Sequence, residues 1–213
     1  MTSKATTAGR TIHWARLYDL GTELLGARVR SLHRGVLELA AIAPGERVLD
    51  VGCGPGRLTL AAALAAEATG ETVGIDASPE MIQVATRKAM RAGSSAQFRV
   101  AAIEAIPSED NHFDVVLANL MLHHLPLELQ RRGVAEVFRV LKPNGRFIVA
   151  EFSAAPRHGV GHLLCVLGVR RGSDHAEHLR SLAGAAGFES IQVAPATSSA
   201  FCLLSARKPA LRS

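Results

Sequence analysis

Residues 48–56 read Val48-Leu49-Asp50-Val51-Gly52-Cys53-Gly54-Pro55-Gly56, a short apolar run that ends in a glycine-rich turn. The run predicts a buried strand, and the glycines permit positive φ angles and let a ligand approach the backbone closely. In open α/β sheets, ligands bind outside the carboxyl ends of the strands, where this turn lies. The stretch therefore predicts a nucleotide-binding α/β fold.

The glycine spacing bears on which nucleotide binds. A dinucleotide fingerprint, G-x-G-x-x-G, would place its third glycine at the position of Arg57, whereas the third glycine here is Gly56. Asp50 ends the strand, and a carboxylate beside the turn would repel a pyrophosphate but attract the ammonium group of an amino acid. The pattern favours a nucleoside joined to an amino acid, with a nicotinamide-dependent oxidoreductase as the alternative.

Farther along the chain, short β-branched runs alternate with Ala- and Leu-rich segments, the pattern of a parallel sheet flanked by helices. Ser78 and Pro79 mark the start of one helix, as an N-cap residue and a first-turn proline. We expect strands at 47–51, 72–76, 97–101, 113–118, 146–152, 188–193 and 201–206, and helices within 12–41 and at 58–68, 79–92, 127–141 and 175–186.

The second expected strand ends in Asp76, about twenty residues after the glycine turn. A carboxylate at this place can accept hydrogen bonds from both hydroxyls of an unmodified ribose. Because enzymes that bind NAD share this feature, Asp76 indicates a nucleoside without choosing between the two ligands.

The sequence resembles the class I S-adenosylmethionine-dependent methyltransferases over nearly all of residues 48–141. The resemblance rests on Asp50-Val51-Gly52-Cys53-Gly54-Pro55-Gly56, on Gly74-Ile75-Asp76-Ala77-Ser78-Pro79-Glu80-Met81, on residues 113–125 and on Leu141-Lys142-Pro143-Asn144-Gly145. It implies an α/β, Rossmann-like, seven-stranded and mostly parallel sheet flanked by helices, with the last strand antiparallel. It also implies S-adenosylmethionine as the cofactor and methyl transfer as the activity.

The same resemblance assigns the cofactor-binding positions. Gly52 and Gly54 would line the methionine moiety, and Asp76 would hold the ribose. Ala102 stands where many family members carry an acidic residue for the adenine amino group, so contacts there are expected from the backbone. The full expected set is Asp50, Gly52, Cys53, Gly54, Gly56, Asp76, Ala77, Met81, Ala102, Ile103, Asn119 and Tyr18.

His123 and His124 are the candidate catalytic bases, since they follow the fourth expected strand at the cofactor edge and histidine titrates near neutral pH. The alternative is a structural pair, with one ring hydrogen-bonded and the other packed. Methyl transfer from a sulfonium needs a base only when the acceptor must lose a proton.

We expect residues 1–43 to form an N-terminal helical lid over the sheet's carboxyl edge, and 44–213 to form the methyltransferase domain, with a small cap insertion at about 154–174. Trp14 and Tyr18 are spaced to share one helix face, and aromatic rings attract a sulfonium. His13, Trp14 and His162 are the expected substrate-pocket residues. Ordinary packing of an amphipathic helix explains the aromatic pair equally well.

Composition narrows the partners. The net charge of +5 comes without the Lys/Arg run that a nucleic-acid patch needs, and no apolar stretch is long enough to span a membrane. The three cysteines lack metal spacing, and paired histidines after residue 157 lack a supporting carboxylate or cysteine cluster, so no metal is expected. We expect a cytoplasmic protein with a small-molecule acceptor, no nucleic acid, and at most peripheral membrane association.

The acceptor is indicated by one short resemblance. Tyr18-Asp19 and Ser31-Leu32-His33-Arg34 are similar to the N-terminal signature of quinone-precursor C-methyltransferases and to soluble phospholipid N-methyltransferases. This implies a small lipophilic or aromatic acceptor: a quinone precursor, a lipid amine or a secondary metabolite. A module that binds S-adenosylmethionine without catalysis is a further alternative.

Overall fold

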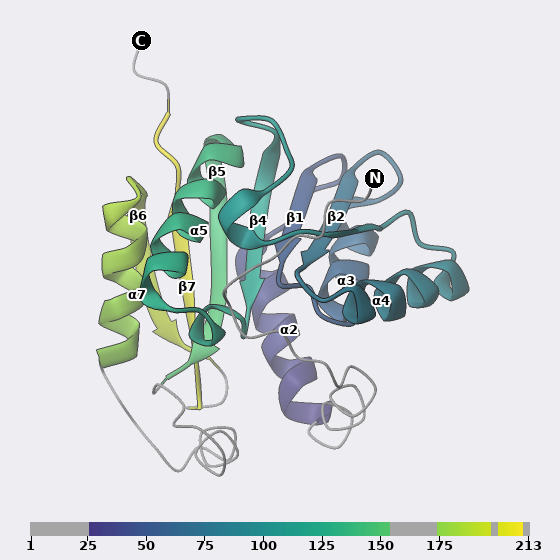
Figure 1. The fold of residues 1–213 in the computed structure, drawn as a ribbon, viewed down its shortest axis with the longest axis horizontal. Coiled ribbons are helices and arrows are strands. Elements are labelled where there is room, and N and C mark those ends of the chain that lie inside the picture. The colour runs from purple at the N-terminus through teal and green to yellow at the C-terminus, as the bar shows by residue number, and fades with distance from the viewer. Residues whose placement is uncertain (1–25, 154–173, 197–199, 211–213) are drawn as a thin grey trace.

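The computed structural model describes residues 26–153, 174–196 and 200–210 as one α/β sandwich (Figure 1). The helices are α2 (Gly26–Ala40), α3 (Arg57–Ala66), α4 (Pro79–Ala92), α5 (Leu127–Val140) and α7 (Asp174–Ala185), with short 3-10 turns η1 (Ile103–Ala105) and η2 (Leu122–His124). The strands are β1 (Arg47–Val51), β2 (Glu71–Asp76), β3 (Gln97–Val100), β4 (Phe113–Asn119), β5 (Leu141–Phe152), β6 (Glu189–Pro195) and β7 (Phe201–Arg207).

The strands form one seven-stranded sheet in the order β3-β2-β1-β4-β5-β7-β6. Strands β1 to β5 pair in parallel, whereas β7 pairs antiparallel with both β5 and β6. The predicted fold class, with an antiparallel last strand, is confirmed. The chain order reverses between β1 and β4, which places a binding crevice beside the carboxyl end of β1.

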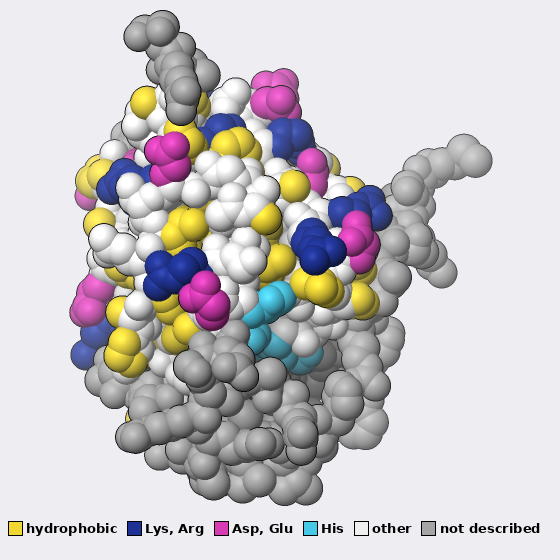
Figure 2. Space-filling view, turned by 90° about the vertical axis from the view of Figure 1, so that its left-hand side faces the viewer, with side chains coloured by type: hydrophobic (Ala, Val, Ile, Leu, Met, Phe, Trp, Pro, Cys, Tyr) yellow, Lys and Arg dark blue, Asp and Glu magenta, His cyan; other side chains and the backbone are white. Residues whose placement is uncertain are grey.

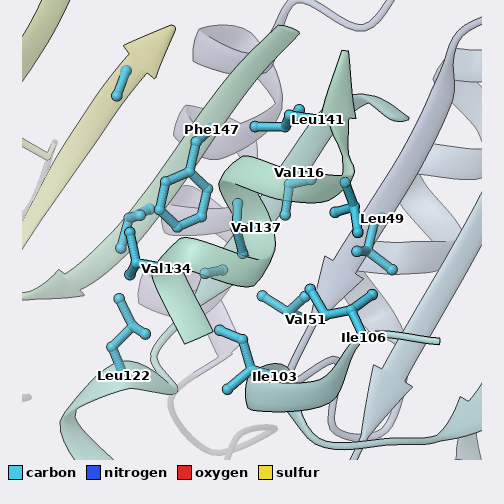
Figure 3. Close-up of a cluster of buried hydrophobic side chains, with 14 of the residues drawn as sticks. Leu49, Val51, Ile103, Ile106, Val116, Leu122, Val134, Val137, Leu141 and Phe147 are labelled. Carbon is cyan, nitrogen blue, oxygen red and sulfur yellow. The ribbon is translucent and has the colours of Figure 1, made fainter. Parts of the chain in front are cut away.

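The core has two layers because the central strands are apolar on both faces, as expected of a parallel sheet covered on both sides. On one face, Leu49, Val116 and Phe147 of the strands meet Val134 and Val137 of α5 (Figure 3). On the other face, α2 and α3 pack against β1, β4, β5 and β7 through a second cluster of buried residues. The site is therefore built on a rigid scaffold.

Local signals in the sequence predicted the start of α4. The Ser78 side chain accepts a hydrogen bond from the Met81 backbone N–H, so the predicted helix cap is confirmed. The segment Lys142-Pro143-Asn144-Gly145, which has the composition of a turn, lies within the bounds of β5. There Phe113 pairs with Leu141 but Val115 pairs with Arg146, so the turn bulges out of the ladder.

Helix α2 differs from the expectation that residues 12–41 lie over the carboxyl edge of the sheet. Val36 and Ala40 are fully buried against the sheet face, and the Ala40 carbonyl accepts a hydrogen bond from Arg146, in the middle of β5 and six residues before its carboxyl end. The apolar stripe of α2 packs into the core, and the first turns of this helix lie near the carboxyl edge of the sheet. Residues 1–25 and the predicted cap at 154–174, apart from Asp174, lie outside the described residues.

Candidate cofactor site

In the glycine turn after β1, Gly54 borders open space, whereas Gly56 is closely packed. A Cβ atom added at Gly54 would have no atom within 4 Å, so this part of the backbone borders a cavity. A Cβ at Gly56 would lie 2.8 Å from both Ala85 and Phe98, so Gly56 lets α3, α4 and β3 pack closely. Both residues have positive φ, 52° and 79°. The turn is shaped for a ligand on one side and for packing on the other.

Asp50 is buried beneath this turn, at 1% exposure. Its Oδ2 accepts a hydrogen bond of 2.6 Å from the Thr59 hydroxyl of α3. Burial raises the pKa of Asp50 to about 7, and the nearby charge of Asp76 adds to the rise. A cation beside Asp50 would favour the ionised form, so the site is suited to an ammonium group.

Asp76 joins the glycine turn to the start of α4. Its Oδ2 accepts from the Gly54 backbone N–H at 2.9 Å, and its Oδ1 accepts from the Ser78 backbone N–H at 2.8 Å. Burial raises its pKa, and the two backbone donors oppose that rise. Each carboxylate oxygen accepts more than one hydrogen bond, so Asp76 retains capacity for ligand hydroxyls.

The opposite wall comes from β4 and α2. The Asn119 side-chain amide lies 3.2 Å from Nε2 of His33, and the Asn119 Oδ1 atom is buried without a hydrogen-bond partner among the described residues. Burial, together with the positive charge of Arg57, lowers the pKa of His33 to about 4. His33 is therefore neutral, and Nε2 can accept from the amide. The open acceptor on Asn119 fits a ligand donor such as an ammonium.

These walls enclose an open pocket of about 530 Å³, counting the space at its mouth. The lining residues are Val29, His33, Asp50, Gly52, Cys53, Gly54, Pro55, Arg57, Leu58, Asn119 and Leu120. Six of these lining residues were not in the expected cofactor-binding set: Val29, His33, Pro55, Arg57, Leu58 and Leu120.

Six of the expected cofactor-binding residues are not among these lining residues: Gly56, Asp76, Ala77, Met81, Ala102 and Ile103. Met81 is buried at the start of α4, Ala102 precedes η1, and the buried Ile103 side chain packs against Gly133 of α5. Ile103 therefore turns its side chain into the core, which leaves its backbone for any ligand contact. Ala77 follows Asp76 and is half-buried.

Cys53 stays a thiol in this turn. It is buried, and burial together with Asp50 and Asp76 raises its pKa well above the usual value. A thiol of this kind is a poor nucleophile, in keeping with a packing role.

His123 and His124 lie on η2, outside the pocket lining. Nδ1 of His123 is 2.7 Å from Oε2 of the buried Glu151, and the two histidine rings are 3.9 Å apart between centroids. Glu151 was missed because it sits in an ordinary strand-like run. The predicted residues His13, Trp14, Tyr18 and His162 lie outside the described residues.

The described residues were also searched for metal sites and for helices that could span a membrane. Within residues 26–153, 174–196 and 200–210, no three His, Cys, Asp or Glu side chains are grouped to hold a metal ion. In the same ranges, no helix is long and apolar enough to cross a membrane.

Comparison with known proteins agrees with this geometry. The profile of the family described as "Methyltransferase domain" matches residues 42–177. A ubiquinone/menaquinone biosynthesis C-methyltransferase UbiE of Ectopseudomonas mendocina is 37% identical over 142 residues, covering 65% of this chain and 55% of that protein. An arsenite methyltransferase of Halobacterium salinarum is 31% identical over 160 residues, covering 73% and 40%. The chain spans about half the length of the curated relatives that it matches.

Solved structures match in fold. A SAM-dependent methyltransferase from Aquifex aeolicus has a TM-score of 0.67 at 19% identity, covering 82% of this chain and 88% of that one. Phosphoethanolamine N-methyltransferase 2 of Haemonchus contortus, in complex with S-adenosyl-L-methionine, has a TM-score of 0.65 at 17% identity, covering 83% and 52%. At these identities the likeness concerns the fold.

Proposed function

This chain belongs to the methyltransferase domain family, and on that basis we propose that it transfers a methyl group from S-adenosylmethionine to a small-molecule acceptor. S-adenosylmethionine carries an ammonium, a ribose with two free hydroxyls, an adenine and a methyl group on a positively charged sulfur. The last of these supplies the chemistry, because a sulfonium methyl is already electrophilic and needs mainly orientation and exclusion of water.

The observation that carries the proposal is the pair of carboxylates around an open glycine turn. Asp50 is buried where an ammonium would relieve its charge, and Asp76 is anchored by Gly54 and Ser78 with capacity left for two hydroxyls. Gly54 borders empty space, and Asn119 offers an unused acceptor. These donors and acceptors fit the amino-acid and ribose parts of S-adenosylmethionine.

The same features disfavour the alternative of a nicotinamide-dependent oxidoreductase. A dinucleotide places a pyrophosphate beside the glycine turn, and Asp50 would repel it. Ala77, Met81, Ala102 and Ile103 are proposed as the adenine side of the site. A lid that includes Tyr18, with His13, Trp14 and His162 toward the acceptor, also remains a proposal.

The acceptor is proposed to be a lipophilic or aromatic small molecule. Two relatives named for their reactions support a small acceptor: a quinone-biosynthesis C-methyltransferase and an arsenite methyltransferase.

The test is isothermal titration of the purified protein with S-adenosylmethionine, S-adenosylhomocysteine and NAD in parallel. We expect micromolar binding of the first two and no binding of NAD. The Asp76→Ala variant should lose this binding, whereas Glu128→Ala, which removes an exposed carboxylate on α5, should retain it. Binding of NAD alone would refute the proposed function, and binding without turnover on any acceptor would support a non-catalytic module.

A further inference from the structure

The chain turns sharply directly after Asn119, the last residue of β4. Leu120 has a φ angle of 53°, in the left-handed region that bulky side chains rarely occupy. Its backbone N–H donates to the Ala150 carbonyl of β5 at 2.8 Å, so the turn is held against the sheet. Strained backbone of this kind clusters at functional sites, because only the surrounding structure can maintain it. Here the strain coincides with the pocket wall that Asn119 and Leu120 form.

The side-chain amide of Asn119 has one end engaged and the other end open. Nδ2 lies 3.2 Å from Nε2 of His33 on α2, whereas Oδ1 is buried without a hydrogen-bond partner among the described residues. A buried oxygen that lacks a donor costs free energy. Because Asn119 lines the pocket, a donor on a bound ligand would remove that cost.

The direction of this amide depends on the protonation of His33. An amide NH2 can only donate, so its contact with His33 requires that Nε2 carry no proton. Burial, together with the positive charge of Arg57, lowers the pKa of His33 to about 4, and the ring is therefore neutral at pH 7. A neutral ring with a bare Nε2 carries its proton on Nδ1. If the proton were on Nε2 instead, the amide would turn over and its NH2 group would face the pocket.

Helix α2 holds the His33 ring against the amide. His33 lies between Leu32 and Val36, which are buried in the core at 3% and 0% exposure. The helix cannot shift along the sheet without exposing these side chains. The ring therefore reaches the pocket wall from a rigid element, and the contact with Asn119 joins α2 to β4 across 86 residues of sequence.

We propose that His33 is a positioning residue that fixes the Asn119 amide with Oδ1 toward the pocket, and that this oxygen selects ligands with an ammonium group. The proposal rests on the proposed function and deepens it, because it concerns the amino-acid end of S-adenosylmethionine. An ammonium has three donors, so it can donate to Oδ1 and to a carboxylate such as Asp50, which lines the same pocket. The phosphate oxygens of a dinucleotide only accept, and Oδ1 would oppose them.

The first experiment determines the tautomer of His33 in the free protein. The chain has nine histidines, and Figure 2 shows histidine side chains gathered on the side of the molecule that carries α7. The His33 signals are therefore assigned with either His33→Met or His33→Gln. Nitrogen-15 NMR of the full chain then reads which ring nitrogen carries the proton at pH 7. We expect Nδ1–H, and either Nε2–H as the main form or a doubly protonated ring would overturn the proposal.

The second experiment compares two ligands by calorimetry. S-adenosylhomocysteine carries the ammonium, whereas 5′-methylthioadenosine has the same nucleoside and lacks the amino-acid end. His33→Met removes the acceptor for the amide, and His33→Gln keeps one in a side chain of similar length. Hydrogen bonds to charged groups are among the stronger ones, so His33→Met should bind S-adenosylhomocysteine about tenfold more weakly.

The other ligand and the control variants separate this effect from a general change in the pocket. The affinity of His33→Met for 5′-methylthioadenosine should change less than about twofold. His33→Gln should retain most of the affinity for S-adenosylhomocysteine. Glu38→Met, which replaces an exposed residue on the same helix, should match the wild type with both ligands. An equal loss of affinity for both ligands in His33→Met would contradict the proposal, because it would indicate a distorted pocket.

A double-mutant cycle separates positioning from direct contact with the ligand. If His33 acts through Asn119, His33→Met should have no further effect on S-adenosylhomocysteine binding in an Asn119→Leu background, because the amide is already gone. An effect of the same size in both backgrounds would rule out the positioning role. Failure of the wild type to bind S-adenosylhomocysteine would instead count against the proposed function.

Discussion

Replacing Asp50 by Asn is expected to stabilise the protein at alkaline pH while it weakens cofactor binding. Asp50 is 1% exposed, and burial raises its pKa from the usual 3.8 to about 7. The folded state thus binds this proton more tightly than the unfolded state does. The associated stability is fully present below the unfolded pKa and is lost as the pH rises through the folded pKa.

The size of the effect follows from the two pKa values. The full difference of about 3 pKa units, at about 1.4 kcal/mol each, corresponds to about 4 kcal/mol. Between about pH 5 and about pH 8, the unfolding free energy of the wild type should fall by about 3 kcal/mol relative to Asp50→Asn. The Asn side chain keeps the shape and can still accept from Thr59, so packing should change little.

Urea unfolding of both proteins across this pH range measures the difference, with Glu128→Gln, which replaces an exposed carboxylate on α5, as the control. A difference in unfolding free energy between wild type and Asp50→Asn that stays constant with pH would refute the reasoning, because it would mean that Asp50 ionises in the folded protein as it does in water.

Cofactor binding provides a second measurement of the same pKa. Near pH 6, S-adenosylmethionine should release a proton from the wild type, visible in titrations in buffers of different ionisation enthalpy, and should bind Asp50→Asn weakly.

Three further variants test the glycine turn and the ribose position. Asp76→Ala removes acceptors for two ligand hydroxyls, and at about 1.5 kcal/mol or more for each such bond we expect about a 100-fold weaker dissociation constant by calorimetry; an unchanged value would place the ribose elsewhere. Gly56→Ala forces a side chain into positive φ and against Phe98, so chemical denaturation should show a loss of about 2–4 kcal/mol. Gly54→Ala meets no atom within 4 Å, so its loss of stability should be nearer 1 kcal/mol while cofactor affinity falls sharply; a variant that binds normally would contradict the cavity assigned to this turn.

The part of the fold set by local signals could be predicted from the sequence. The apolar run before Gly52 and the cap at Ser78 each act within a few residues of chain, and each has the predicted place. The position of α2 could not be predicted from such local signals. An amphipathic pattern predicts that one face of a helix is buried, but it does not predict the surface against which that face packs. Helix α2 packs against the face of the sheet.

The sequence indicates the strand side of the candidate site, but it gives no sign of the contacts between residues that are distant along the chain. His33 meets Asn119 across 86 residues of sequence, and Glu151 meets His123 across 28. Glu151 ends a run of otherwise apolar residues, where a single carboxylate carries no periodic signal. Its meaning comes from the donors that surround it, and those are set by tertiary structure.

The place of β7 in the sheet bears on how the protein is made. Strand β7 lies between β5 and β6, and a Cβ at Gly35 of α2 would lie 3.3 Å from Leu203 of β7. A ribosome adding about 5–20 residues per second therefore delivers β6 before the strand that joins it to the sheet, and delivers α2 long before the surface it covers. The nascent chain must keep both segments from pairing elsewhere until residues through Arg207 have left the exit tunnel. Completion of the sheet therefore waits for β7, after the other six strands have been made.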